Sequence, residues 1–279
     1  MKSDDFPRCI DPNWPSDGQQ MLRWPELCAA RRRWRAKGDG AAYLELRARL
    51  RQVIPSLPCG LGSFFLCSLW DELTEASRAA VERELVPDAR ALFLQDLQGA
   101  VDTQLRCGMF GDALADQTRL TQALGEPSPA DLPACKEQAA ALVRLAFLTE
   151  LAGEPEPCLA AYRRAQRTLA PLCLQDPDDP ALWHLLAYVH LALGELPGDG
   201  RPAAQHLELA CRAWRAALEK AGDVPLYRSL LHRAEASLKT PRPAWPRGLF
   251  TGPDGVAAGR IDPHILAGDD LNDPFPTVF

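Results

Sequence analysis

The sequence predicts an all-α protein built from antiparallel helical hairpins. Ala, Leu, Arg and Glu dominate the middle of the chain, whereas Thr, Ile and Val are sparse, which favours helix over strand. Apolar residues recur at helical spacing in successive stretches. Most of the 25 prolines fall near the N-terminus, at junctions between those stretches, or after Thr240, so they separate helices and do not oppose them.

Glycines and prolines divide the N-terminal part of the chain into helices. The segment 38–40, Gly-Asp-Gly, is a C-cap and turn signal, and Pro55 ends the helix after it. The strongly apolar run 63–73 predicts a buried helix, and another follows before Pro87. The helices expected here are 20–37, 41–53, 63–73 and 75–85.

The central stretch 137–171 is the best-formed hairpin. Leu142 belongs to an apolar stripe before Gly153, and Tyr162 and Leu169 belong to a second stripe after it, which we expect to face the core. A Pro/Ser linker is expected over 126–133, and a Pro/Asp linker over 175–180. The other helices expected here are 89–107, 111–124, 181–193, 203–221 and 225–239.

Composition divides the chain into four parts. They are an N-terminal arm (1–18), an N-terminal helical region (19–86), a run of helical repeats (87–240) and an irregular C-terminal tail rich in Pro and Gly (241–279).

The central hairpins are similar to one another when they are aligned on Gly108, Gly153 and Gly194. A large apolar residue stands eleven positions before each glycine, and a small or compact one four positions later. These are Leu97, Leu142 and Trp183, then Val101, Ala146 and Ala187. A proline closes two of the units, at Pro127 and Pro171. Over about 94–225 the pattern resembles the tetratricopeptide repeat, whose period is ~34 residues. The alternative is an irregular helical bundle without true repeats.

The resemblance implies a right-handed α-solenoid, in which the first helices of successive hairpins line a concave groove that binds a partner. By register, the groove residues would be Gln95, Gln98, Asp102, Arg106, Val143, Phe147, Glu150, His184 and Tyr188. Gln98 and Asp102 stand where tetratricopeptide co-chaperones hold a ligand's terminal carboxylate with Lys and Asn. Asp102 would repel a carboxylate, so binding of a chaperone tail is not expected.

A basic patch precedes the first turn. It consists of Arg31, Arg32, Arg33, Arg35 and Lys37. Such a run binds an acidic partner, an anionic lipid or a nucleic acid, or it is a solvated helix face that pairs with local acidic residues. The net charge is −6 and no nucleic-acid-binding module is recognisable, so nucleic acid is not expected. The tail has the opposite charge, because 249–279 contains five Asp and one Arg.

No metal site and no cofactor are expected. His184, His190, His206 and Cys211 fall in one hairpin, but their spacing along each helix does not bring them to one face. A Cys–His nucleophile would also need an orienting third group, and none is recognisable. We therefore assign no catalytic residue.

The sequence favours a protein–protein interaction module: an adaptor, a client-specific chaperone or a regulatory scaffold that binds another protein or peptide in its groove. The alternatives are an inhibitor or immunity-type protein that occludes a partner enzyme, and an enzyme on a helical scaffold. Self-association, or packing of the tail on the helical body, is a further expectation. Nine cysteines without a Cys-x-x-Cys pair, no apolar signal segment and no membrane-spanning run predict a cytoplasmic protein with reduced thiols.

Overall fold

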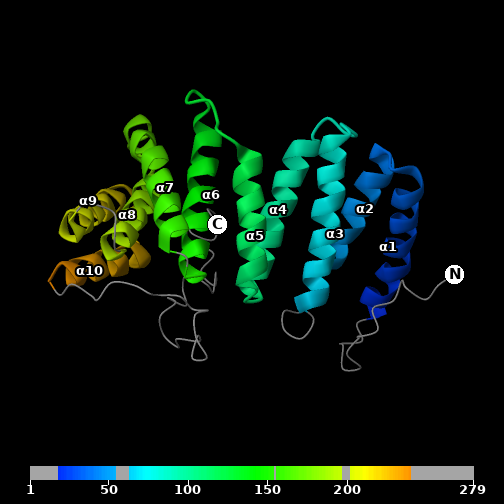
Figure 1. Ribbon diagram of the computed structural model, residues 1–279, viewed down its shortest axis with the longest axis horizontal. Helices are drawn as coiled ribbons and strands as arrows, with labels where there is room; N and C mark the ends of the chain where they lie inside the picture. The colour runs from blue at the N-terminus through cyan, green and yellow to red at the C-terminus, as the bar shows by residue number, and fades with distance from the viewer. Residues whose placement is uncertain (1–17, 55–62, 154, 197–201, 240–279) are drawn as a thin grey trace. The chain divides into compact units, whose positions relative to one another are not determined.

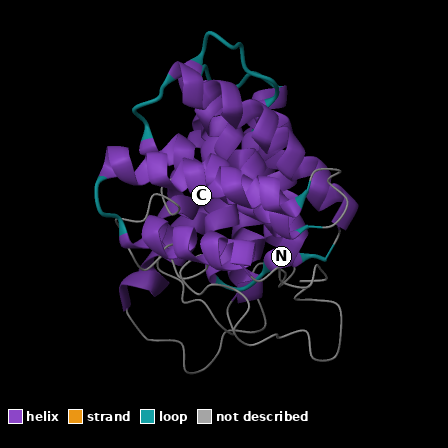
Figure 2. Ribbon diagram, turned by 90° about the vertical axis from the view of Figure 1, so that its left-hand side faces the viewer, coloured by secondary structure: helices purple, strands orange, loops and turns teal. Residues whose placement is uncertain are grey.

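The computed structural model describes residues 18–54, 63–153, 155–196 and 202–239. All regular structure in these ranges is helical, as Figure 2 shows, so the all-α expectation is confirmed. The chain divides into two compact units, of which unit 1 ends at Met109 and unit 2 begins at Phe110. Within each unit, helices that follow one another along the chain pack as hairpin-like neighbours, an arrangement compatible with a helical repeat.

Unit 1 is described over four helices, coloured blue to teal in Figure 1. They are α1 (Gly18–Lys37), α2 (Gly40–Val53), α3 (Ser63–Glu82) and α4 (Ala89–Arg106). The pairs α1–α2 and α3–α4 form hairpins, and α2 packs on α3. Their shared core is aliphatic and aromatic, and includes Leu27, Tyr43, Leu46, Leu50, Leu66, Leu69, Leu73 and Ala100.

Helix α3 corrects the sequence analysis, which expected two helices over 63–73 and 75–85. The helix has no break at Thr74, because its hydroxyl donates to the backbone carbonyl of Asp71 at 3.1 Å and stays within the helical turn. The apolar density of the sequence falls beyond this point, but the buried stripe continues at helical spacing through Ser77 and Ala80.

A buried carboxylate joins three helices of unit 1. Asp96 of α4 is fully buried and accepts hydrogen bonds from Nε and Nη2 of Arg47 at 2.9 Å each, and from Nε of Arg51 at 2.9 Å. The hydroxyl of Ser77 in α3 donates to it at 2.6 Å, and Tyr43 donates to Ser77 at 3.1 Å. Burial raises the pKa of Tyr43, so its hydroxyl stays protonated and remains a donor.

Unit 2 is described over six helices, coloured green to orange in Figure 1. They are α5 (Phe110–Leu124), α6 (Leu132–Leu151), α7 (Pro155–Gln175), α8 (Pro180–Glu195), α9 (Ala203–Ala221) and α10 (Pro225–Lys239). Each packs on the next, and α6 also contacts α8, the first helix of the following hairpin. Tyr162 and Leu169 are fully buried, which confirms their predicted place in the core.

A lysine holds the start of α6 to the turn between α7 and α8. Nζ of Lys136 donates to Asp176 at 2.7 Å and to Asp179 at 2.6 Å, and the hydrogen bond to Asp176 is the main cause that raises the pKa of Lys136. Asp179 also caps α8, because its Oδ1 accepts from the backbone N–H of Ala181 at 2.9 Å. The Pro/Asp linker is therefore a fixed turn.

Two expected boundaries in unit 2 are wrong. Helix α6 begins at Leu132, inside the expected linker, because Asp131 caps it by accepting from the backbone N–H of Ala134 at 3.1 Å. Helix α7 continues past Pro171 to Gln175. Pro171 is exposed, and the buried residues that follow it, Leu172 and Cys173, hold the last turn on the core.

The sequence paired the helices on either side of Gly108, which lies next to the boundary of the two units. Within unit 1, α4 packs on α3, and within unit 2, α5 packs on α6. The hairpins centred on Gly153 and Gly194 are present as α6–α7 and α8–α9.

Gly99 of α4 lies against Trp70 of α3. A Cβ added at Gly99 would lie 2.5 Å from a ring carbon of Trp70, which is buried. We expect Gly99→Ala to lower the free energy of unfolding by about 1–2 kcal/mol, because the overlap outweighs the higher helix propensity of alanine. Urea unfolding followed by circular dichroism measures the change.

Gly111 in α5 provides the matched control for this substitution. It has no atom within 4 Å of an added Cβ, so Gly111→Ala should be neutral or slightly stabilising. Equal effects of the two substitutions would contradict the close contact between Gly99 and Trp70.

None of the helices in the described ranges is long and apolar enough to cross a lipid bilayer.

Candidate functional site

The first helices of the two unit 1 hairpins, α1 and α3, line a groove of about 800 Å³. Side chains bridge the two helices at two points along it. The rings of Trp24 and Phe65 lie 5.5 Å apart, and Nε of Arg31 donates to Glu72 at 2.8 Å. A groove of this size holds several side chains of a bound ligand.

Aromatic rings form one part of the groove lining. Trp24, Trp34 and Phe65 are all half-buried. The guanidinium of Arg31 lies 5.2 Å from the ring centroid of Trp24, and Trp34 lies 6.1 Å from the buried ring of Tyr43. Each ring is therefore held by its neighbours and keeps part of its surface open, which is typical of residues that anchor a protein ligand.

Cations gather where α1 ends. Lys37 and Arg83 line the groove, and neither has an ion-pair partner among the residues that the structure describes; Arg35 lines it as well. Gly38 has a φ of 60° and its N–H donates to the carbonyl of Trp34 at 2.9 Å. A Cβ on Gly38 would lie 3.2 Å from Nη1 of Arg83, so the guanidinium rests against this turn. Cations are also favoured there by the helix dipole.

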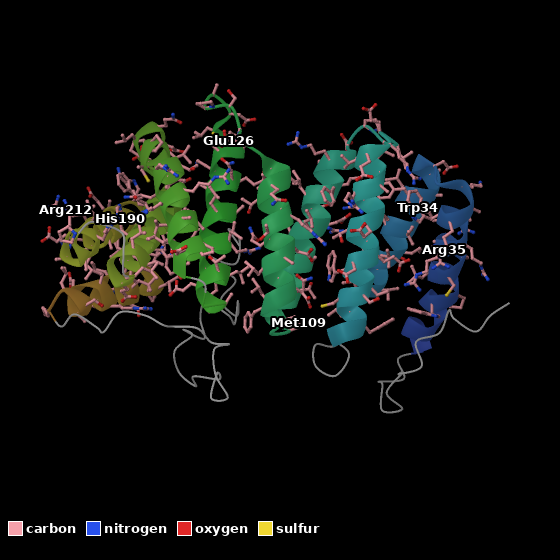
Figure 3. The ribbon with its side chains drawn as sticks, viewed as in Figure 1. Trp34, Arg35, Met109, Glu126, His190 and Arg212 are labelled. Atoms are coloured by element: carbon pink, nitrogen blue, oxygen red, sulfur yellow. The ribbon has the colours of Figure 1, made fainter. Side chains whose placement is uncertain are left out.

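The predicted basic patch does not form one surface. Arg31, Arg35 and Lys37 line the groove, whereas Arg33 pairs with Glu45 of α2 and Arg32 is exposed outside the groove lining. The hydrogen bond from Arg33 lowers the pKa of Glu45. Arg31 and Arg33 thus pair with the nearby acidic residues Glu72 and Glu45. Figure 3 labels Trp34 and Arg35, consecutive residues of α1 that both belong to the groove.

The acidic residues of the groove already have partners. Glu72 binds Arg31, and Glu75 pairs with Arg78 of the same helix. Lys37 and Arg83 therefore give the groove an excess of positive charge at one end. This arrangement suits a ligand that carries both carboxylates and apolar groups.

The predicted groove residues of α4 lie in unit 1, where each of them makes a hydrogen bond with a residue of α2 or of α4 itself. Oε1 of Gln95 accepts from Arg47 at 2.7 Å, and Nε2 of Gln98 donates to Asp102 at 2.9 Å. Nε of Arg106 donates to the backbone carbonyl of Asp102 at 3.3 Å. Gln95 and Arg106 are exposed, whereas Gln98 and Asp102 are half-buried.

The other five predicted groove residues belong to unit 2 and are buried there. They are Val143, Phe147, Glu150, His184 and Tyr188, none more than 9% exposed. The carboxylate of Glu150 accepts from the hydroxyl of Tyr162 at 2.7 Å, and burial raises the pKa of Tyr162 well above its usual value. A buried side chain presents no surface to a partner in this conformation, so the α1–α3 groove replaces these residues as the candidate site.

The sequence analysis missed two buried polar pairs between α8 and α9. Nε1 of Trp214 donates to Nδ1 of His184 at 3.1 Å, and the two Nδ1 atoms of His190 and His206 lie 3.0 Å apart. Spacing along a single helix does not reveal such pairs. Within each pair, the two residues lie at similar distances along the chain from the turn between α8 and α9, and residues so placed face each other across an antiparallel hairpin.

The described residues contain neither a cluster of metal ligands nor a disulfide bond. No group of three or more His, Cys, Asp or Glu side chains is placed to hold a metal ion in this part of the chain. The described cysteines are free thiols, and five of them are buried, which confirms a core-filling role for Cys67, Cys135, Cys158, Cys173 and Cys211.

Comparison with known proteins finds no family model that matches the chain and no matching curated relative.

Proposed function

We propose that the protein is a protein–protein interaction module that binds an acidic segment of a partner protein in the α1–α3 groove. The observation that carries the proposal is the combination of half-buried Trp24, Trp34 and Phe65 with the ion-pair-free cations Lys37 and Arg83. The aromatic rings supply apolar anchors, and the cations select carboxylates. An adaptor, a client-specific chaperone or a regulatory scaffold would use such a groove.

A peptide fits this chemistry better than a nucleic acid does. Glu72 and Glu75 line the α3 side of the groove and would oppose a continuous phosphate backbone. A peptide alternates carboxylates with apolar side chains, so its negative charge can be placed at Lys37 and Arg83 while apolar groups contact the rings. The helices that form the groove are packed in the core of unit 1, so little order remains to be gained on binding.

Peptide selection tests the proposal. A display library of random short peptides, selected on the full chain, should yield sequences that combine Asp or Glu with Phe, Trp or Leu. The double substitution Lys37→Glu with Arg83→Glu should then weaken binding of the labelled consensus peptide by about tenfold, because two attractive charges become repulsive. Fluorescence polarisation measures the affinity.

The control reverses the same amount of charge outside the groove. Arg32 on α1 and Arg212 on α9 are exposed and do not line the groove. Figure 3 labels Arg212. Arg32→Glu with Arg212→Glu should change the affinity less than about twofold. Equal losses in the two double variants, or a single-stranded RNA oligonucleotide that binds more tightly than the peptide, would overturn the proposal.

A further inference from the structure

We propose that the C-terminal segment 269–279 of this chain occupies the α1–α3 groove within the same molecule and competes there with the partner segment. This inference rests on the proposed function, since it takes the same groove as the binding site. The segment lies outside the described residues, and its sequence is DDLNDPFPTVF. The described groove lining comes from α1 and α3 and the residues that directly follow them.

The negative charge of this segment makes it a suitable ligand for the groove. It carries three carboxylates, those of Asp269, Asp270 and Asp273, and no Lys or Arg. The excess charge of the groove is positive, at Lys37 and Arg83. Opposite charges attract, and salt screens this attraction because Lys37 and Arg83 are exposed.

The apolar side chains of this segment also match the groove. Phe275 and Phe279 follow the carboxylates, so one short stretch contains both groups that the groove is suited to bind. The rings of Trp24 and Phe65 offer the matching apolar surface. Pro274 precedes Phe275 and opposes a helix, which favours entry as an extended chain whose side chains reach both the cations and the rings.

Residues 240–268 join the segment to the end of α10, and a chain of that length spans at most roughly 100 Å.

The N-terminal arm is the competing occupant, and charge disfavours it. Residues 1–17 also contain carboxylates and aromatic rings, but Lys2 and Arg8 offset part of their negative charge. These two cations reduce the attraction of the arm to Lys37 and Arg83.

A tethered segment in the groove lowers the apparent affinity of the groove for a partner. Tethering gives the segment an effective concentration on the order of millimolar, so even weak binding competes with a partner in solution. A partner then binds only when it displaces the segment, and any process that removes the segment raises the apparent affinity.

Carbodiimide coupling of the full chain tests the contact directly. The reagent joins a lysine amine to a carboxylate only when the two touch, and mass spectrometry of the digest identifies the pair. We expect Lys37 to couple to Asp269, Asp270 or Asp273 within one molecule. Lys37→Arg keeps the charge and abolishes the product. Coupling of Lys37 only to the N-terminal arm, coupling of the segment only to other lysines, or products that join isotopically labelled to unlabelled chains would each overturn the inference.

Peptide affinity separates failure of this inference from failure of the proposed function. The full chain with all three carboxylates of the segment changed to Asn should bind the selected acidic peptide about tenfold more tightly than the unchanged chain, because the competitor is weakened. The matched control removes three exposed carboxylates elsewhere, through Asp88→Asn, Asp112→Asn and Glu208→Gln, and should leave the affinity unchanged.

The two proposals fail in different ways. If the peptide binds and depends on Lys37 and Arg83 while the segment variant shows no gain, the groove is a binding site that its own tail does not occupy. If no acidic peptide depends on those two cations, the proposed function itself is wrong.

Discussion

Replacing Asp96 with asparagine is expected to lower the free energy of unfolding of unit 1 by about 3 kcal/mol. The carboxylate is fully buried and is the shared partner of two guanidinium groups, those of Arg47 and Arg51. Without its charge, two cations face each other, and Ser77 loses a strong acceptor. Both arginines are partly exposed, so water compensates some of the loss.

An exposed aspartate beside the same helix provides the control. Asp88 precedes α4 and its side chain makes no capping hydrogen bond, so Asp88→Asn should change the free energy of unfolding by less than about 0.5 kcal/mol. Urea unfolding gives the difference, and hydrogen exchange should assign the loss to α2, α3 and α4. Similar midpoints for the two variants would show that the buried ion pairs do not stabilise the unit.

Lowering the pH from 7 to 4 is expected to cost unit 2 about 3 kcal/mol through His184 alone. Burial lowers the pKa of His184 from 6.5 to about 3, and a proton on Nδ1 would also oppose the hydrogen bond that Trp214 donates to that atom. The folded-state pKa lies below that of the unfolded chain. The stability is therefore fully present above pH 6.5 and is lost as the pH falls toward 3.

A non-titrating acceptor isolates this contribution. In His184→Asn the side-chain oxygen can accept a hydrogen bond from Trp214. Between pH 6 and 4 the free energy of unfolding of this variant should fall less steeply than that of the unchanged protein, and the two slopes should differ by up to about 1.4 kcal/mol per pH unit. His232 is exposed on α10, so His232→Asn should keep the unchanged slope. The pair His190 and His206 is present in all three proteins and cancels from the comparison. Identical slopes for all three proteins would contradict the assignment.

Helix positions were predictable because local signals set them. Helices α9 and α10 have the bounds that the sequence predicted, since a proline or a glycine stands at each end of these stretches. The errors occurred where a local signal was outweighed by burial. Pro171 should have ended α7, but Leu172 and Cys173 pack on the core beyond it. In α3, the hydrogen bond of Thr74 stays within the helix, and the buried residues Ser77 and Ala80 follow it.

The candidate site was predictable only in part. The cations Arg31, Arg35 and Lys37 were visible as a cluster in the sequence. Phe65 of α3 and Arg83, which follows α3, reach the groove only through the packing of two hairpins. The register argument also placed groove residues on α6, although that helix has apolar residues all around it. Such a helix is typical of an interior position, and every residue from Gln138 to Leu151 except Leu145 is buried.

The Asp96 ion pairs also set an order of events in folding. They join residues 49 and 45 positions apart in the sequence, whereas the contacts within each hairpin are local. Loop-closure entropy delays distant contacts, so the hairpins should form before the pairs to Arg47 and Arg51 close. Contacts that form after the transition state slow unfolding more than they speed folding. We therefore expect the buried carboxylate to slow the unfolding of unit 1 more than it speeds its folding.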